Sequence, residues 1–530
     1  MSCSDPRLED GFIMNICGCR NDTSISIYPP SRMSLQLPQV EHQLISLRLF
    51  KLAEGGFNRI FQATFRDGKS VIARLPYPST EPKHYAVASE AATLDYLRQH
   101  GFYTPEVCAW CSTGANPVGA EYIIMEKLGG TPLGDIWYSM TPKVQHKVMK
   151  QIVEWETRLM SLNFPACGSI YYHKDLPSER TIPLPDQHDS AFCIGPIAHY
   201  SWWNGERRTM DGPHQLTYSG QLVNESWLGR NSMRGVVNPL NVSIEKFIVF
   251  FRVSPDSHIS DLSDYLTLVP HLDFKAGASL HRPVMRHPDL QQNNILMSDT
   301  NEIVGLIDWQ HSTVLPMGLA AGMPKHFQNY GDPDSESLRE PQLDLPSNYD
   351  SLLPSEQASI RETTRKRLVL FLYAAITQRL NKEHYDAIFD HSTILRQRLL
   401  QSAGMPWEGD LATLRAEMIR TIQNWPELAA ADSLAGESKT CSEPPIEYSD
   451  KIVQETLDLD AQQKEADVAM EEMRDILGVD IFGWVPNDNY GAAKEMAGVM
   501  KAKMLEMAET PRVLSEVEDH FPFDDFDEHA

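Results

Sequence analysis

The sequence lacks any long hydrophobic run. Its most apolar stretches are "FIVFF" at 247–251 and "LVLFLYAAI" at 368–376, and both fall far short of the ~20 residues that a membrane-spanning helix needs. We expect them to form a buried strand and a buried helix. The first residues, "MSCSDPRLEDGFIMN", contain early acids and no apolar segment typical of a signal peptide. These absences exclude a membrane span and favour a cytoplasmic location.

Basic residues are also few. The chain has 47 Lys or Arg against 72 Asp or Glu, a net charge of −25. Residues 441–530 alone have 7 Lys or Arg against 23 Asp or Glu, a balance of −16, and they end in "FPFDDFDEHA". Nucleic acid binding needs a basic surface that this composition does not supply. The acidic C-terminal tail is instead a candidate surface for a protein partner.

Cysteines are scarce, and no internal repeat or long low-complexity tract is present. Four of the 8 cysteines form two pairs that are close in the sequence, Cys17 with Cys19 and Cys108 with Cys111. Four thiolates could bind zinc, but "TPEVCAWCS" is typical of a strand, on which Cys108 and Cys111 would point to opposite faces. We therefore interpret the cysteines as reduced thiols of an intracellular protein.

The 530 residues are enough for two or three structural units. Residues 1–43 form a polar lead-in, partly flexible, and from 44 to 130 apolar runs alternate with turn signals. Strands are predicted at about 46–53, 58–65 and 70–75, followed by a helix over "HYAVASEAATLDYLRQHG" and two strands in "TPEVCAWCS" and "AEYIIMEKLGG". The two remaining predicted parts of the chain are a mainly helical part over 131–430 and an acidic extension over 431–530. An exposed linker is predicted at 429–450, with helices around 451–476 and 490–508.

One motif carries chemistry. In "HPDLQQNN", the residues His287, Asp289 and Asn294 follow the pattern H-x-D-x-x-x-x-N, and Asp308 ends the strand-like run "EIVGLID". The segments "NILM" and "EIVGLI" predict a hairpin that brings Asp308 beside Asn294, where a carboxylate and an amide oxygen would suit Mg²⁺. Asp289 would then reach a hydroxyl to be phosphorylated, as in a kinase catalytic loop. The alternative is a polar turn with a structural histidine.

Parts of a nucleotide site precede this motif in the required order. Gly55 and Gly56 lie between the first two predicted strands, where small residues let backbone N–H groups approach phosphates. Arg74 on the third strand could reach the nucleotide phosphates, and Glu90 on the following helix could pair with it. The backbone from Glu126 to Leu128 resembles a hinge that would bind adenine. Each signal alone is weak, but their order is specific.

These residues make the chain resemble the aminoglycoside phosphotransferase family over about 45–380, and within it the fungal group that includes altered inheritance of mitochondria protein nine. The segments that carry the resemblance are "LAEGGFNRIF", "VIARLPYP", "HPDLQQNNILM", "IVGLIDWQ" and "FPFDDFDE". The resemblance implies a bilobal α+β protein-kinase-like fold, with a small five-stranded N-lobe and a large helical C-lobe. It also implies ATP and Mg²⁺ as cofactors. Asp289 would be the catalytic base supported by His287, and Asn294 and Asp308 would be the metal ligands.

The predicted function is ATP- and Mg²⁺-dependent transfer of a phosphoryl group to a hydroxyl of a small molecule. A catalytically silent nucleotide-binding scaffold is the alternative. A protein kinase is disfavoured because Trp309 and Gln310, rather than Phe-Gly, follow Asp308. The aromatic segment at 192–214 is a candidate for the acceptor side of the site, although Trp202 and Trp203 could equally pack in the core. Family resemblance adds the mitochondrion as an alternative location.

Overall fold

The structure is a computed structural model, and two compact units are distinguished in it. The described residues are 13–17, 24–28, 48–65, 68–184, 191–203, 255–272, 279–404, 412–434, 443–479, 485, 489–508 and 510–523. The core unit comprises 1–53, 57–222 and 274–394, and the helical unit comprises 54–56, 223–273 and 395–530. The predicted strand "FIVFF" and residues 204–214 lie outside the described residues, and the predicted four-part division of the chain stays a prediction.

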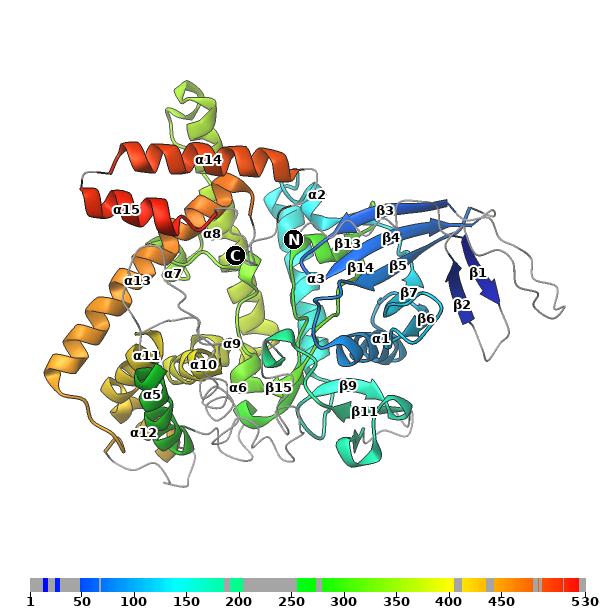
Figure 1. The fold of residues 1–530 in the computed structure, drawn as a ribbon, viewed down its shortest axis with the longest axis horizontal. Coiled ribbons are helices and arrows are strands. Elements are labelled where there is room, and N and C mark those ends of the chain that lie inside the picture. The colour runs from blue at the N-terminus through cyan, green and yellow to red at the C-terminus, as the bar shows by residue number, and fades with distance from the viewer. Residues whose placement is uncertain are drawn as a thin grey trace. The chain divides into compact units, whose positions relative to one another are not determined.

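The core unit contains a five-stranded antiparallel sheet, as predicted (Figure 1). Helix α1 follows its third strand and lies along one face of the sheet. The strand order is β3 (Arg48–Glu54), β4 (Asn58–Thr64), β5 (Ser70–Pro76), β7 (Tyr122–Glu126) and β6 (Val107–Cys111), and α1 spans Lys83–Gln99.

The alternation of side chains along β5 directs Arg74 toward α1. Ala73 and Leu75 are buried with Phe61 in a cluster on one face of the sheet. Because successive strand residues point to opposite faces, Arg74 lies on the other face, as does Ile72, which packs against the large core cluster containing residues of α1. The sequence pattern of one strand thus brings a cation to the helix that carries Glu90.

The predicted hairpin after the catalytic motif is present. Strand β13 (Ile295–Met297) pairs antiparallel with β14 (Ile303–Leu306), and Ile295 lies opposite Leu306. A short strand, β8 (Thr131–Pro132), adds to the other edge of β13. Gly130, just before β8, has φ of 118°, and a Cβ there would lie 3.0 Å from the carbonyl oxygen of Met297. Glycine is therefore required where the chain enters this sheet.

Helices form most of the remaining core unit. Helix α8 includes the predicted buried run 368–376 and packs against α3, and Val148, Met149 and Ile152 of α3 contribute to the large hydrophobic cluster. The helices are α2 (Leu133–Trp137), α3 (Pro142–Met160), α6 (Met317–Ala320), α7 (Pro333–Glu336), α8 (Pro354–Leu380) and α9 (Lys382–Phe389). The other strands are β1 (Ile13–Cys17), β2 (Ser24–Tyr28), β9 (Ser169–Tyr172), β10 (Ile182–Pro183), β11 (Phe192–Gly195), β12 (Pro283–Met285) and β15 (Val314–Pro316).

The helical unit contains the helices α5 (Pro255–Leu268), α11 (Thr413–Gln423), α12 (Trp425–Leu434), α13 (Asp450–Leu477), α14 (Tyr490–Glu506) and α15 (Pro511–His520), and α10 (His391–Gly404) from its fifth residue onward. The two helices predicted in the acidic extension correspond to α13 and α14. The linker prediction is wrong at its start, because residues 429–434 belong to α12. Trp425 and Leu428 of this helix are buried and favour a helix over a linker.

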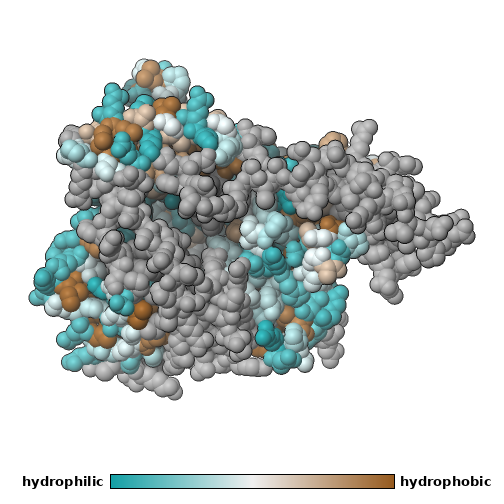
Figure 2. All heavy atoms as spheres, in the orientation of Figure 1, coloured by the Kyte–Doolittle hydropathy of each residue, from teal (hydrophilic) through white to brown (hydrophobic). Residues whose placement is uncertain are grey.

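No helix among the described residues combines the length and hydrophobicity that crossing a membrane requires. On the face of the molecule drawn in Figure 2, hydrophobic residues of the described chain occur in small groups among hydrophilic ones.

Candidate active site

His287 joins the two segments that carry the catalytic motif. Its Nδ1 accepts a hydrogen bond from the backbone N–H of Asp289 at 3.1 Å, and its Nε2 lies 3.0 Å from the carbonyl oxygen of Ile307. Since Nδ1 accepts, Nε2 carries the proton and donates it to Ile307. Burial lowers the pKa of His287 and keeps the ring neutral, as this arrangement requires. The histidine thus fixes the Asp289 loop against the residue before Asp308.

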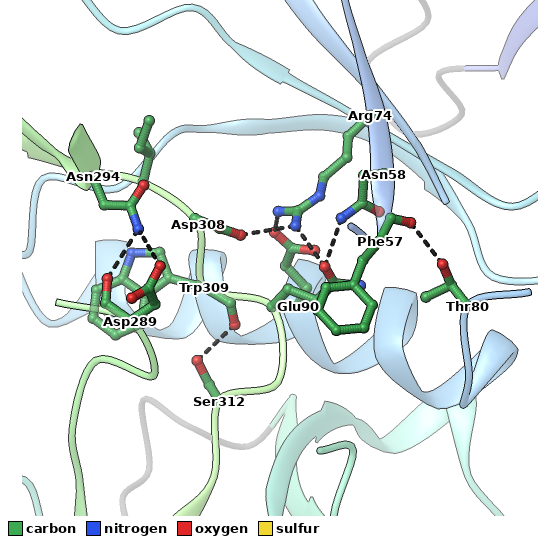
Figure 3. Close-up of polar contacts among 12 residues, drawn as sticks. Phe57, Asn58, Arg74, Thr80, Glu90, Asp289, Asn294, Asp308, Trp309 and Ser312 are labelled. Carbon is green, nitrogen blue, oxygen red and sulfur yellow. Dashed lines mark hydrogen bonds and ion pairs between the residues drawn. The ribbon is translucent and has the colours of Figure 1, made fainter. Parts of the chain in front are cut away.

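Asp289 and Asn294 are in direct contact (Figure 3). The Nδ2 group of Asn294 donates to the Asp289 backbone oxygen at 2.9 Å and to Oδ2 at 3.2 Å. Gln291 also donates to Oδ2, at 2.6 Å. Because both donors use Oδ2, Oδ1 of Asp289 is the oxygen that could accept a proton from a substrate. Because Nδ2 faces Asp289, the amide oxygen of Asn294 is the atom that could bind a cation.

Asp308 lies beside this pair because the hairpin closes there. The backbone N–H of Ile307 donates to the carbonyl oxygen of Asn294 at 3.0 Å. Asp308 has φ of 66°, a left-handed conformation uncommon outside glycine, and its side chain is 43% exposed. Burial opposes ionisation of this carboxyl, but the charge and hydrogen bond of Arg74, together with the nearby His287 and His311, lower the pKa of Asp308.

Arg74 and Glu90 form a buried ion pair, as the order of motifs predicted (Figure 3). Their side chains are 8% and 3% exposed. A second nitrogen of Arg74, Nη2, donates to Oδ1 of Asp308 at 2.8 Å. Burial raises the pKa of Glu90 to about 7, because Arg74 only partly offsets the loss of hydration. The structure therefore brings the predicted cation to the predicted metal ligand.

The other residues predicted to bind the nucleotide have few contacts that bear on this role. Gly55 and Gly56 connect β3 to β4, and a Cβ at Gly55 would have no atom within 4 Å, so packing gives no reason for glycine there. The backbone N–H of Glu126 donates to the carbonyl oxygen of Glu106 at 2.8 Å, so this donor is used within the protein. A Cβ on Gly305 would lie 2.6 Å from a methyl group of Leu128, so Leu128 packs against the hairpin of β13 and β14.

Two polar residues of the site were missed by sequence reasoning. Gln310 accepts a hydrogen bond from Nη2 of Arg74 at 2.6 Å and another from Nδ2 of Asn58 at 2.6 Å. Asn58 ends the glycine-containing segment "EGGFN" and Gln310 ends "IDWQ". Their closeness to recognised motifs was the available signal, but no spacing rule joins two residues so far apart.

A second buried network lies directly before the catalytic loop. Arg286 donates to Glu156 of α3 through Nε at 2.8 Å and also through Nη2, and it donates to the carbonyl oxygen of Ala320 at 2.8 Å. The hydroxyl of Tyr373 on α8 donates to the other oxygen of Glu156. Burial opposes ionisation of Glu156, but the charge of Arg286, the nearby His384 and the hydrogen bonds from Tyr373 and Arg286 together lower its pKa. The residue before His287 therefore has polar contacts to three helices, α3, α6 and α8.

The donor set fits a magnesium ion. No group of three or more His, Cys, Asp or Glu side chains suited to a metal occurs within the described residues. Mg²⁺, however, is commonly held by one or two carboxylates together with substrate phosphates and water. The amide oxygen of Asn294 and the exposed carboxylate of Asp308 meet that requirement, and zinc would need softer ligands.

In the aromatic segment at 192–214, some residues pack in the core and others lie at the edge of the site. Trp203 is buried, and its indole N–H donates to Ile197 at 2.8 Å, which favours a packing role for that residue. The ring of Tyr200 lies 5.1 Å from Phe57 and 5.2 Å from His311, which follows the Asp308 loop. The rest of the segment, 204–214, lies outside the described residues.

The cysteines that the structure describes are free. No disulfide is formed by Cys108, Cys111, Cys167 or Cys193. The pairing register of β6 with β7 shifts between Val107 and Ala109. The reduced state of the cysteines stays a prediction.

The comparisons with known proteins identify the family of the chain. A phosphotransferase enzyme family model matches residues 51–191. A subtelomeric hrmA-associated cluster protein of Aspergillus fumigatus is 32% identical over 494 residues, which cover 87% of this chain and 93% of that protein. The chain belongs to the phosphotransferase enzyme family and has its protein-kinase-like fold, as the sequence motifs predicted.

Further relatives are more distant. Altered inheritance of mitochondria protein 9, mitochondrial, of Candida tropicalis is 23% identical over 507 residues, 88% of this chain and 77% of that protein. Among solved structures, the ternary complex of streptomycin, ATP and APH(2″)-IIa has a TM-score of 0.32 and 11% identity, covering 72% of this chain and 93% of that one. With a score this low, the family assignment rests on the sequence matches.

Proposed function

We propose that this protein transfers the γ-phosphoryl group of Mg·ATP to a hydroxyl of a small molecule. The observation that carries the proposal is the convergence of Asp289, Asn294 and Asp308 at one end of the hairpin, with Arg74 bonded to Asp308. A carboxylate, two hard-oxygen ligands and a cation are the groups that phosphoryl transfer uses for positioning and charge neutralisation.

Each residue has a separate role in this proposal. Oδ1 of Asp289 would receive the proton of the acceptor hydroxyl, whose oxygen forms the new bond to phosphorus. The bond between the γ-phosphorus and the bridging oxygen breaks, and its electron pair leaves with ADP. Asn294 and Asp308 would hold Mg²⁺, which neutralises phosphate charge when bound. His287 would hold the Asp289 loop and the Asp308 loop together through hydrogen bonds of its two ring nitrogens.

The nucleotide would lie between these groups and the five-stranded sheet. Arg74, oriented by Glu90, would contact the α- and β-phosphates, and backbone N–H groups at Gly55 and Gly56 would contact phosphate oxygens. Carbonyl and N–H groups from Glu126 to Leu128 would bind adenine. Solved structures in the comparison include a ternary complex with ATP and streptomycin, and ATP use by a protein of this family is consistent with these roles.

Nucleotide binding and transfer are tested separately. We expect Mg·ATP at 100 times its Kd to stabilise the wild-type protein by about 2.7 kcal/mol, and Asp308→Ala to remove that effect. Asp289→Asn should keep the stabilisation and lose transfer to every acceptor in a metabolite panel. Asp299→Ala, on an exposed carboxylate at the hairpin turn, is the matched control and should behave as wild type.

The results separate the two functions under consideration. If Mg·ATP leaves the melting temperature of the wild-type protein unchanged at millimolar concentration, nucleotide binding is refuted. Binding without transfer to any acceptor would instead favour a nucleotide-binding scaffold.

We also propose the mitochondrion as the alternative to the cytoplasmic location predicted from the N-terminal sequence. Its support is the printed name of relatives such as the Candida tropicalis protein, which calls them mitochondrial. Fluorescence imaging of the tagged full chain would distinguish the two compartments.

A further inference from the structure

Arginine at position 74 has more donors to satisfy than a lysine would have. Its guanidinium bonds to Glu90 through Nη1 and to Asp308 through Nη2. A guanidinium carries five N–H donors in a fixed plane, whereas an ammonium group is compact and can rotate to suit fewer partners. Since Arg74 is buried with 7% of its surface exposed, each additional N–H needs an acceptor inside the protein.

Gln310 supplies such an acceptor and serves a second donor with the same atom. Its Oε1 accepts from Nη2 of Arg74 and from Nδ2 of Asn58, each at 2.6 Å. Asn58 and Gln310 are both 6% exposed. Asn58 begins β4, and the preceding carbonyl, of Phe57, accepts hydrogen bonds from Thr80 at 2.6 Å and from the N–H of Tyr77 at 3.0 Å. One amide oxygen therefore links the start of β4, the cation and the Asp308 loop.

The backbone around Gln310 fixes the direction of its side chain. Asp308 and His311 both have left-handed φ values, 66° and 65°. The hydroxyl of Ser312 donates to the carbonyl oxygen of Trp309 at 2.6 Å, and the Trp309 indole N–H donates to Leu306 at 3.1 Å. Two non-glycine residues in this conformation persist only where surrounding contacts determine the turn. These contacts hold Gln310 between Asn58 and Arg74.

We propose that Gln310 is a positioning residue that holds Arg74 so that Asp308 can share its charge between the guanidinium and a metal ion. This inference rests on the proposed function. Of the two hydrogen bonds described above for Nη2 of Arg74, only the one to Asp308 remains when Gln310 is replaced. The guanidinium then binds Asp308 more tightly. Asp308 then becomes a poorer ligand for Mg²⁺, and Asn58 loses its link to the loop. The effect should fall on Mg·ATP binding more than on the acceptor.

The test is a double-mutant cycle on the full chain, with Mg·ATP binding measured by titration at several Mg²⁺ concentrations. A buried hydrogen bond to a charged group corresponds to a change of about tenfold to a hundredfold in affinity. We expect Gln310→Leu to weaken Mg·ATP binding by that factor and to raise the Mg²⁺ concentration required. Gln310→Glu keeps an oxygen acceptor and should restore most of the affinity. If an acceptor is found, its KM should change little.

Arg74→Lys completes the cycle, because a lysine no longer needs Gln310. The double variant Arg74→Lys with Gln310→Leu should bind Mg·ATP about as well as Arg74→Lys alone. Gln145→Leu is the matched control, since Gln145 is a glutamine of α3 that is 5% exposed and lies outside the site. It should change the melting temperature without changing the affinity.

The outcomes are distinguishable. Wild-type affinity in Gln310→Leu, or additive effects of the two single changes, overturns the role of Gln310 alone. No Mg·ATP binding by the wild-type protein overturns this role and the proposed function together. If Gln310→Leu does not fold, unchanged affinity in Asn58→Ser, which removes the donor on the other side of Gln310, overturns the link to β4.

Discussion

The buried pair of Glu156 and Arg286 gives a stability prediction whose size follows from the structure. Glu156→Gln removes one charge from a site where the two side chains are 3% and 17% exposed. The guanidinium then keeps the carbonyl of Ala320 as an acceptor but has no counter-charge among its described partners. Removing one partner of a buried ion pair costs about 3–5 kcal/mol. At ~2 °C per kcal/mol for a large domain, the melting temperature should fall by roughly 6–10 °C.

The control is an exposed pair in the same unit. Lys382 and Asp386 are 74% and 55% exposed, so Asp386→Asn should cost about 0.3–0.5 kcal/mol. Thermal and urea unfolding of both variants check the difference. Replacing both charged partners with apolar residues, Glu156→Leu with Arg286→Met, should recover most of the loss, because no unpaired charge remains. A Glu156→Gln variant as stable as Asp386→Asn would refute the assignment of a buried, interacting pair.

Two further predictions concern other buried ionisable groups. His384 is fully buried, and burial lowers its pKa from 6.5 to about 4. The folded protein therefore binds fewer protons than the unfolded chain in this range, so stability present above pH 6.5 should decline as the pH falls toward 4. His384→Gln should flatten that decline in pH-dependent unfolding, and an unchanged slope would contradict it. In the helical unit, Asp460 is 2% exposed and pairs with Arg420. Asp460→Asn should make α13 more sensitive to limited proteolysis, whereas Glu455→Gln, in an exposed pair, should not.

Much of the site could be predicted because it depends on local rules. Two short apolar runs separated by a turn predict a hairpin, and the hairpin alone brings Asp308 beside Asn294. Alternation along one strand directs Arg74 to a single face of the sheet. Helical residues after that strand offered Glu90 as its partner. Each of these predictions depends on residues that are close in the sequence, so it could be made without the structure.

The supporting contacts could not be predicted in the same way. Asn58 and Gln310 are 252 positions apart, and Glu156 and Arg286 are 130 apart. Neither pair follows from a period or a motif, because each depends on how separate elements pack in three dimensions. The start of the predicted linker failed for a related reason. Its small residues predicted exposure, but Trp425 and Leu428 are buried and favour the helix that continues to Leu434.

The short strand β8 restricts how far the five-stranded sheet can rotate relative to the hairpin of β13 and β14. Strand β7 ends at Glu126, and Thr131 is already paired with Met297 of the catalytic hairpin. Any rotation of the five-stranded sheet relative to the hairpin must therefore be absorbed by dihedral changes at residues 127–130, which include Gly129 and Gly130. This segment is a connection of fixed length, and under the proposed function we expect that stiffening it would slow nucleotide exchange without altering the groups proposed to contact the phosphates.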